Sequence, residues 1–367
     1  MEDLQILKDN STDVFIPDEY SEEGLKRALI FIPDLSLNGA QTVMIELLDI
    51  LRKFYSVTII SSEDGEYREK YLNLGVRISV RPYVSASEDF KEYMRGYDLV
   101  LLNTSSTIPY LYFFINTQVK TLIWLHESKD QLQNAGCQLP PPQLLSPNIT
   151  ICGVTKKVKQ GIKELFDFDT ELLHMPIREE NLPSEKSDNK VRFFIPAAYT
   201  YIKGQDILLG AIAKLPPDLR AKSEFIFCGY TLEGQKEYHE KIVKMGEMLD
   251  NVTVLGSLDR SEVYKYYSEC DCVAAPSRID STPTSIIEGM MFKKLVLVSS
   301  GAGISQYLTD CVNGFVYSDE NGLFQRLLLL ISDCGKLSAV ADKGYEIYKD
   351  NFSPDAVEKN LLRIISE

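Results

Sequence analysis

The chain has 367 residues, more than one hydrophobic core usually supports, so two domains are the default expectation. A formal net charge of −14 argues against nucleic acid as a partner, because phosphate backbones are bound by clustered Lys and Arg. Seven scattered cysteines, an acidic polar N-terminus and a longest apolar run of only 108–115 argue against a secreted or membrane-spanning protein. We therefore expect a soluble cytoplasmic protein with free thiols.

The first half of the chain has the pattern of a parallel α/β domain. Residues 1–24 are acidic and weakly periodic, and we interpret them as an extension without chemistry of its own. Short apolar runs then alternate with helical patterns such as 41–54, which is typical of strands buried on both faces of a sheet. The expected strands are 28–32, 57–61, 76–80, 99–102, 121–125 and 150–152. Residues 1–180 are thus predicted to form a Rossmann-like domain.

The second half repeats this alternation. The polar segment 181–189, with Pro and Ser, is the best candidate for a linker. The strands expected after it are 191–195, 225–228, 252–255, 272–275, 295–298 and 314–317, and the helices expected at the end are 323–332, 337–348 and 354–366. Residues 181–350 are therefore predicted to form a second Rossmann-like domain, with a cleft between the two domains as the expected site.

Candidate residues of the first half lie in loops that follow strands. Gly39 and Ala40 open the first helix, where a glycine allows a ligand to approach the backbone closely, although a simple turn is an equal explanation. His126 follows strand 121–125 at its carboxyl end, and Asn103 ends the strand before it. A structural role is the alternative for both. The Pro-rich segment 137–148 is a stiff surface connection or a wall of an acceptor site.

Two loops of the second half offer weaker candidates. Lys203 stands in a strand-to-helix loop, where a lysine is usually solvated but can reach a diphosphate as a point charge. Gly229 follows strand 225–228 and is either an ordinary turn glycine or a point of close approach to a nucleotide.

The most informative run is 271–294, which reads as a strand, a polar loop and a helix. Thr282 is the expected cap of this helix and Pro283 fits its first turn. The free N–H groups of Thr284 and Ser285, together with the helix dipole, favour an anion, and phosphate is the usual one.

Two carboxylates flank that helix start. Glu288 lies among apolar neighbours, and a glutamate is rarely buried without a partner. Because helical side chains lean toward the N-terminus, its carboxylate suits the two hydroxyls of a ribose, with a narrow solvated stripe as the alternative. Asp280 is either a turn aspartate or an acceptor for the hydroxyls of a second polyol unit. Together these residues predict a nucleotide-sugar site.

This run resembles the signature of the retaining glycosyltransferases of family 4, which have the GT-B fold. The matching residues are Pro276-Ser277, the acids Asp280 and Glu288 with seven residues between them, and the Gly-rich turn 301–303. The first acid is Asp280 where the family has a glutamate. The loop at Gly39 resembles the family's Gly-Gly-Ala loop, with Asn38 in place of the first glycine.

The segment ending at Lys203 resembles the family's Arg-x-x-x-x-Lys-Gly motif, in which both cations neutralise the leaving diphosphate. Ala197 and Ala198 stand where the arginine is expected, and Arg278 is our candidate to replace it. The resemblance also implies that the last helix, within 351–367, crosses back onto the first domain.

The resemblance implies transfer of a sugar, with retention, from a nucleotide diphosphate sugar to an acceptor hydroxyl on a saccharide, a lipid-linked saccharide or a protein, as in polysaccharide, glycolipid or glycoprotein glycan synthesis. It assigns catalysis to Asp280, Lys203 and His126. It assigns substrate binding to the other candidates: Glu288, Thr284, Ser285, Arg278, Gly39, Ala40, Asn103 and Gly229.

The resemblance further implies that no metal cofactor is needed, and it allows contact with the inner face of the membrane. The missing arginine and the substitution at Asp280 prompt an alternative. In that alternative the chain is a catalytically weak or inactive transferase-like subunit that binds nucleotide sugar and supports a partner transferase.

Overall fold

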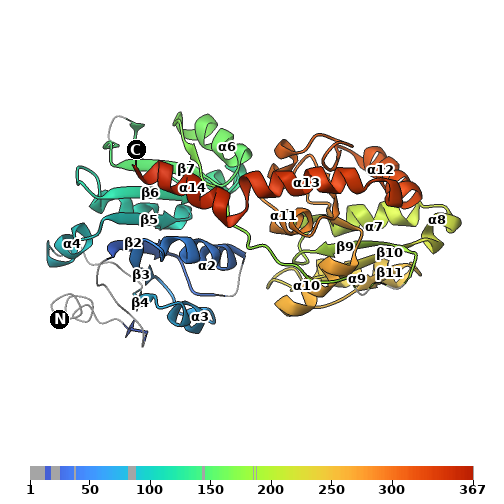
Figure 1. Cartoon of the computed structure of the whole chain (residues 1–367), viewed down its shortest axis with the longest axis horizontal. Helices are drawn as coiled ribbons and strands as arrows, with labels where there is room; N and C mark the ends of the chain where they lie inside the picture. Colours follow the sequence, from blue (N-terminus) through green and yellow to red (C-terminus); the bar gives the residue numbers. More distant parts are fainter. Residues whose placement is uncertain are drawn as a thin grey trace. The chain divides into compact units, whose positions relative to one another are not determined.

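The computed structural model describes residues 13–17, 25–36, 39–81, 88–142, 145–184, 186 and 188–366. The chain divides into two compact units, each with its own sheet (Figure 1). The first unit is Met1–Pro176 together with Pro354–Glu367, and the second is Ile177–Ser353. Both are parallel-sheet α/β domains, so the predicted fold class is confirmed for each of them.

The sheet of the first unit has the order β1-β4-β3-β2-β5-β6-β7-β8. Its neighbouring strands are parallel except that β1 pairs antiparallel with β4. The strands are β1 Asp13–Phe15, β2 Lys26–Ile32, β3 Tyr55–Ser61, β4 Arg77–Val80, β5 Leu99–Asn103, β6 Lys120–Leu125, β7 Ile149–Gly153 and β8 Glu171–Leu172. The six strands predicted from apolar runs are all present, whereas β1, which lies within the 1–24 extension, and β8 were not predicted.

The helices of this unit are α2 Gly39–Leu51, α3 Arg68–Asn73, α4 Glu88–Arg95, the 3₁₀ helix η1 Ser105–Phe113, α5 Lys129–Asn134, α6 Lys156–Phe166 and α14 Pro354–Ser366. Although α14 ends the chain, it packs on α2 of the first unit. Its apolar stripe of Val357, Leu361 and Ile364 is buried, and Asn360 donates a hydrogen bond to the carbonyl of Leu172. No helix in the described part of the chain is both long and apolar enough to cross a membrane.

The second unit has a sheet in the order β11-β10-β9-β12-β13-β14, and every neighbouring pair in it is parallel. The strands are β9 Val191–Pro196, β10 Ser223–Cys228, β11 Val252–Val254, β12 Cys272–Ala275, β13 Leu295–Ser299 and β14 Phe315–Tyr317. The chain leaves β9 toward β10 on one side, and β12 lies on the other side. The connections after β9 and β12 therefore run to opposite sides of the sheet, and ligands of open α/β sheets bind at such a switch point.

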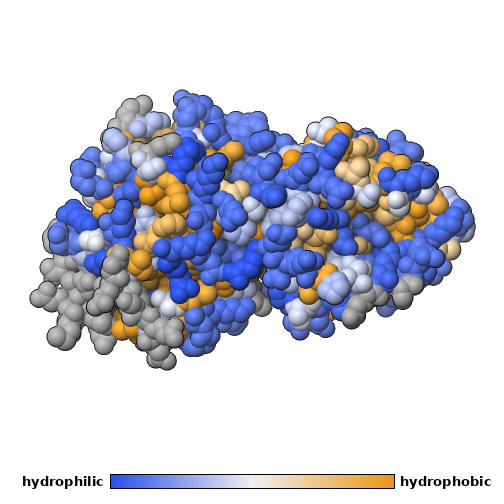
Figure 2. Space-filling view, viewed as in Figure 1, coloured by the Kyte–Doolittle hydropathy of each residue, from blue (hydrophilic) through white to orange (hydrophobic). Residues whose placement is uncertain are grey.

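The helices of the second unit are η3 Tyr201–Lys203, α7 Gln205–Ala213, α8 Pro217–Ala221, α9 Lys236–Glu247, α10 Arg260–Glu269, α11 Thr284–Met291, η4 Gly303–Tyr307, α12 Glu320–Asp333, η5 Cys334–Lys336 and α13 Ser338–Asn351. The core under them includes the rings of Phe193 and Phe225, which stack with their centroids 4.5 Å apart. On the face seen in Figure 2, hydrophilic residues surround small apolar patches, as is normal for a folded domain.

Candidate functional site

The loops after β9 and β12 bring together two of the predicted catalytic residues. Lys203 ends η3, which follows β9, and Asp280 lies in the loop between β12 and α11. The Lys203 Nζ donates a hydrogen bond of 2.6 Å to Asp280 Oδ2, and the side chain of Asp280 is only 8% exposed. The other oxygen, Asp280 Oδ1, accepts the backbone N–H of Thr282 at 3.1 Å. A lysine and an aspartate that the sequence separates by 77 residues thus form one polar centre.

Two glycines allow a close approach to the loop after β12: Gly204, in the loop after β9, and Gly301, in the turn after β13. Gly204 adopts φ +69°, and a Cβ there would stand 2.2 Å from the carbonyl oxygen of Pro276. A Cβ on Gly301 would stand 2.2 Å from the carbonyl oxygen of Arg278. The Gly-rich turn also bonds to the loop directly, because the N–H of Gly303 donates to the backbone oxygen of Asp280 at 2.8 Å. A side chain at Gly204 or Gly301 would push its segment away from the loop after β12.

The start of α11 differs from the prediction in one respect. Thr282 does not cap the helix: the cap position is Pro283, with φ −67° and ψ 102°, and no side chain bonds to the first turn. The reason is that Asp280 takes the N–H of Thr282 and holds it in a turn, so the helix starts later than predicted. The Thr282 hydroxyl is buried without a partner in the described structure. The backbone N–H groups of Thr284 and Ser285 also find no acceptor among the described residues.

Glu288 is buried, as the apolar surroundings in the sequence predicted, with 4% of its surface exposed. Both carboxylate oxygens have protein partners that the sequence did not reveal. Tyr267 Oη donates to Oε2 at 2.6 Å and Arg260 Nη2 donates to Oε1 at 2.6 Å. Burial lowers the pKa of Arg260, but Glu288 more than offsets this and raises it above the ordinary value. Each oxygen keeps a further lone pair for a ligand hydroxyl.

A sequence signal for these partners exists in α10. Arg260, Tyr264 and Tyr267 are spaced four and three residues apart, so they share one helix face. The guanidinium of Arg260 lies over the ring of Tyr264, 4.3 Å from its centroid. A basic and aromatic stripe beside a helix that carries a lone buried acid indicates a partner for that acid.

Arg278, the predicted substitute for the missing family arginine, is engaged within its own unit. Its Nη1 and Nη2 donate to the two carboxylate oxygens of Asp206 at 2.8 and 3.1 Å. Nη1 also donates to the carbonyl of Tyr201 at 2.7 Å, and the guanidinium lies 3.9 Å from that ring's centroid. Burial raises the pKa of Asp206, but hydrogen bonds from Arg278, Lys241 and Tyr238 hold it well below its usual range. A role for Arg278 toward a diphosphate stays a prediction.

Gly229 lies at the end of β10, beside the loop after β9. A Cβ on it would stand 2.1 Å from the carbonyl oxygen of Ala197, so no other residue fits without moving that loop. Its N–H donates to the carbonyl of Gly256 at 3.1 Å. This residue therefore shapes the edge of the second sheet, and its contact with a nucleotide stays a prediction.

In the first unit, His126 and Asn103 meet at the carboxyl ends of β6 and β5. His126 Nε2 and Asn103 Oδ1 are 2.9 Å apart, and the imidazole lies edge-on to Trp124 at 4.4 Å between ring centroids. Burial lowers the pKa of His126 to about 4, although Glu127 opposes the shift. The ring is therefore neutral at pH 7. The Nδ2 of the buried Asn103 has no partner in the described structure, so its N–H groups are available to a ligand.

Gly39 and Ala40 form the first turn of α2, as predicted, but their side-chain surroundings lie outside the described part of the structure, as does Asn38 altogether. Their contact with a ligand stays a prediction.

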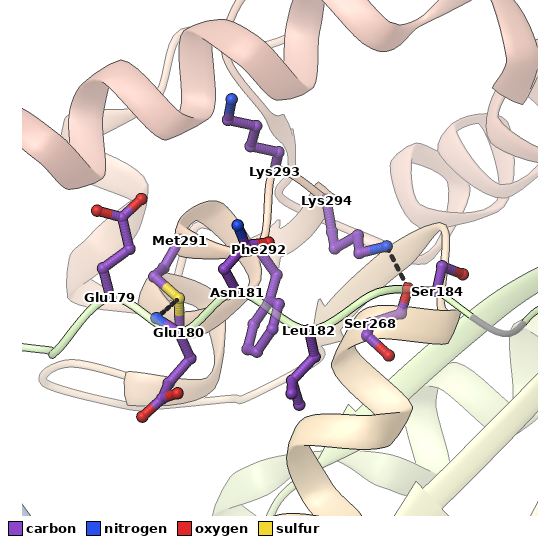
Figure 3. Close-up of a pocket in the computed structure, with 10 residues that line it drawn as sticks. All are labelled: Glu179, Glu180, Asn181, Leu182, Ser184, Ser268, Met291, Phe292, Lys293 and Lys294. Carbon is purple, nitrogen blue, oxygen red and sulfur yellow. Dashed lines mark hydrogen bonds between the residues drawn. The ribbon is translucent and has the colours of Figure 1, made fainter.

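A cavity of about 230 Å³ in the second unit lies at the other end of α11 (Figure 3). Met291 Sδ accepts the backbone N–H of Glu180 at 3.2 Å, which fastens the incoming chain to the helix. Lys294 extends toward Ser268, where its Nζ donates to the carbonyl at 2.7 Å, while Lys293 points away from it. Because α11 starts at Thr284 and ends at Met291, this cavity is separate from the Lys203–Asp280 centre.

The second unit is a parallel α/β domain with a lysine, two acids and unpartnered helix N–H groups at the carboxyl edge of its sheet. A domain of this class is suited to bind a nucleotide. Residues 177–346 match the family model described as glycosyl transferases group 1. This part of the chain is therefore similar to glycosyltransferase group 1 domains.

Known proteins resemble a larger part of the chain. An uncharacterized glycosyltransferase of Methanocaldococcus jannaschii is 25% identical over 221 residues, which cover 59% of this chain and 59% of that relative. The match therefore spans less than two thirds of the relative's length. Among solved structures, HepE of Anabaena in complex with UDP and glucose has a TM-score of 0.75 at 16% identity and covers 93% of this chain and 99% of its own. Sucrose-phosphate synthase of Thermosynechococcus elongatus has a TM-score of 0.71 at 14% identity, covering 93% and 98%. At these identities the likeness is one of fold.

Proposed function

We propose that the chain is a retaining glycosyltransferase that moves a sugar from a nucleoside diphosphate sugar to an acceptor hydroxyl. The observation that carries this proposal is the pairing of Lys203 with the buried Asp280 next to the unpartnered N–H groups that begin α11. A cation, an anion-binding helix start and a carboxylate for hydroxyls are the three elements that a sugar diphosphate needs. The glycosyl transferases group 1 match over the same residues supports the assignment.

The polar groups of the second unit each have a role in this reaction. Glu288 accepts the ribose hydroxyls, while the N–H groups of Thr284 and Ser285 bind the diphosphate. Asp280 accepts hydroxyls of the donor sugar. As the bond between the anomeric carbon and the diphosphate breaks, Lys203 stabilises the charge that develops on the leaving oxygen. The acceptor oxygen bonds to the anomeric carbon on the face that the diphosphate leaves, and its proton passes to the departing diphosphate.

The first unit contributes neutral polar groups in this proposal. His126 is uncharged at pH 7, so it would act on a ligand of the first unit by hydrogen bonding rather than by charge. The unpartnered Nδ2 of Asn103 supplies a hydrogen-bond donor next to His126. We further propose that no metal ion takes part, because Lys203 supplies the positive charge at the diphosphate. The seven free cysteines fit a reducing compartment, and we place the reaction in the cytoplasm.

The ion pairs made by the two cationic side chains favour a second candidate function. Lys203 is paired with Asp280 and Arg278 with Asp206, so each of these positive charges is already partly neutralised. A chain of this kind would bind nucleotide sugar, turn it over weakly or not at all, and support a partner transferase.

A turnover assay separates the two candidates. Purified protein is incubated with a panel of UDP-, ADP- and GDP-sugars, with and without neutral and lipid-linked saccharides, and the released nucleotide is measured. Release that rises with an acceptor supports the transferase, and an NMR spectrum of the product that shows the donor's anomeric configuration supports retention. Nucleotide binding without release for every donor and acceptor would favour the supporting subunit, and an inverted product would refute retention.

A further inference from the structure

A second cavity, of about 410 Å³, lies in the first unit at the carboxyl end of β5. Its volume is in the range of pockets that hold small molecules. Its walls come from η1 and from the chain after α5, and they include Ser105, Ser106, Tyr112, Cys137 and Gln138. None of the described residues that line it carries a charge. The last two of these residues begin the Pro-rich segment that the sequence singled out.

Glu127 connects this cavity, through hydrogen bonds, to the Asn103–His126 pair at the ends of β5 and β6. Its Oε1 accepts hydrogen bonds of 2.7 Å from both the N–H and the hydroxyl of Ser105, and its Oε2 accepts the N–H of His126 at 2.9 Å. The intervening Thr104 has φ +75°, an uncommon conformation for a residue with a side chain, and such positions cluster at ligand sites. The cavity wall therefore starts at the Asn103–His126 pair.

The groups in the cavity match the surface of a sugar. Ser105 donates its proton to Glu127, so its oxygen is left to accept a hydrogen bond from a ligand hydroxyl. Gln138 is exposed and its amide can both donate and accept. The ring of Tyr112 is 67% exposed, which is unusual for so large an apolar surface. A pyranose presents C–H groups on its face and hydroxyls at its rim, so it can cover the ring and satisfy the polar groups together.

The electrostatics disfavour an anionic ligand. The carboxylate of Glu127 is bonded to Ser105 in the cavity wall, and its negative charge acts on Cys137, another lining residue. Burial raises the pKa of the Cys137 thiol to about 11, and Glu127 contributes to the rise. A phosphate or carboxylate in the cavity would meet this negative charge without a lysine or arginine in the described lining to offset it.

We propose that this cavity binds a neutral saccharide unit of the acceptor, with Tyr112 against the face of the sugar ring and Ser105 and Gln138 at its hydroxyls. That this sugar is the acceptor of the transfer rests on the proposed function, whereas the binding of a neutral sugar rests on the cavity alone. The acceptor class is therefore an uncharged glycan end rather than a phosphorylated headgroup.

Saturation-transfer NMR on the full chain tests this proposal without requiring turnover. The probes are methyl glycosides of common neutral hexoses, each compared with the same sugar carrying a 6-phosphate. We expect transfer to at least one neutral glycoside, and we expect Tyr112→Ala to weaken its binding by at least about tenfold. Leu362→Ala, which truncates an exposed apolar side chain on α14, is the matched control and should bind the glycoside as the wild type does. UDP binding by calorimetry should be the same in all three proteins.

The possible results bear on the proposal in different ways. Tighter binding of the phosphorylated sugars would overturn it, and so would equal glycoside binding by Tyr112→Ala and the wild type, or no transfer to any glycoside. Glycoside binding that depends on Tyr112 in a protein that binds none of UDP, ADP and GDP would support this cavity while refuting the proposed transferase. In an active enzyme, Tyr112→Ala should raise the acceptor KM and leave the donor KM unchanged.

Discussion

Lys203 and Asp280 form an ion pair of 2.6 Å in which the carboxylate is almost completely buried. The lysine side chain is 27% exposed, so the pair presents its positive partner to the solvent edge of the sheet. Removing either partner leaves the other charge uncompensated, and the acid would be the more costly one to strand because it is the more buried.

Lys203→Met should lower kcat by about 10²–10³, because a group that stabilises charge developing on the leaving oxygen acts mainly in the transition state. Donor KM should change little. The double variant with Asp280→Ala should lose about as much activity as the single variants do, since the two residues work as a unit. Steady-state kinetics with the best donor measures this. Lys214→Met, which removes an exposed lysine paired with Glu320, is the control and should retain activity.

Tyr267→Phe should weaken UDP binding by about tenfold, because Glu288 loses the hydrogen bond that fixes one of its oxygens. The donor KM should rise while kcat stays near the wild-type value, and Glu288→Ala should show a larger change in the same direction. Tyr266→Phe is a matched control on the same helix, since its ring stacks on Phe194. Calorimetric titration with UDP decides the matter. Unchanged affinity in both Tyr267→Phe and Glu288→Ala would remove Glu288 from the nucleotide site.

The strands of both sheets could be predicted because burial on both faces leaves a direct trace in the sequence. The run 295–298, for example, is apolar throughout and becomes the fully buried β13. The edge strand β1 left no such trace, because three residues that pair antiparallel with β4 have neither a continuous apolar run nor a useful period. Its existence depends on the partner strand rather than on its own residues.

The site was predictable in its residue types but not in its pairings. An apolar helix around Glu288 showed that the acid needs a partner, yet Arg260 lies 28 residues away and only the packing of α10 on its neighbours identifies it. Thr282 was expected to cap α11 from local preference alone. Instead, the carboxylate of Asp280 accepts the N–H of Thr282, which keeps Thr282 in a turn and out of the cap position.

Arg278→Lys tests whether this arginine serves the diphosphate or the loop. The bidentate contact with Asp206 cannot be made by a lysine, so the free energy of unfolding should fall by about 1–3 kcal/mol. Asp206→Asn should reproduce the loss if Arg278 is structural. Urea denaturation and kinetics on both variants measure this. A drop in kcat for Arg278→Lys that Asp206→Asn does not share would instead establish Arg278 as a contact to the leaving group.

The stability of the protein should fall as the pH drops from 6.5 toward 4, in part because of His126. Its pKa in the folded state is about 4, below the ordinary value of 6.5, so the unfolded chain binds a proton in this window and the folded chain does not. The stabilisation is complete above pH 6.5 and is lost as the pH approaches 4. His174, whose pKa burial also lowers to about 4, contributes in the same way. His126→Asn should therefore reduce, without abolishing, the difference between urea midpoints at pH 7 and pH 5. If the difference between the two urea midpoints is the same in His126→Asn and the wild type, the pKa of His126 in the folded state is not lowered.

Gly204→Ala and Gly210→Ala should change stability in opposite directions although they lie on one segment of chain. At Gly204, φ is +69° and a Cβ would meet the oxygen of Pro276 at 2.2 Å, so strain and overlap should cost about 2–4 kcal/mol. Gly210 lies within α7 and a Cβ there meets no atom within 4 Å, so alanine should stabilise by about 0.5–1 kcal/mol. Thermal unfolding measures both. Because Gly204 sets the distance between the two loops, its variant should also lose the activity that depends on the Lys203–Asp280 pair. A Gly204→Ala protein with wild-type stability and turnover would show that the loops are not held together at this point.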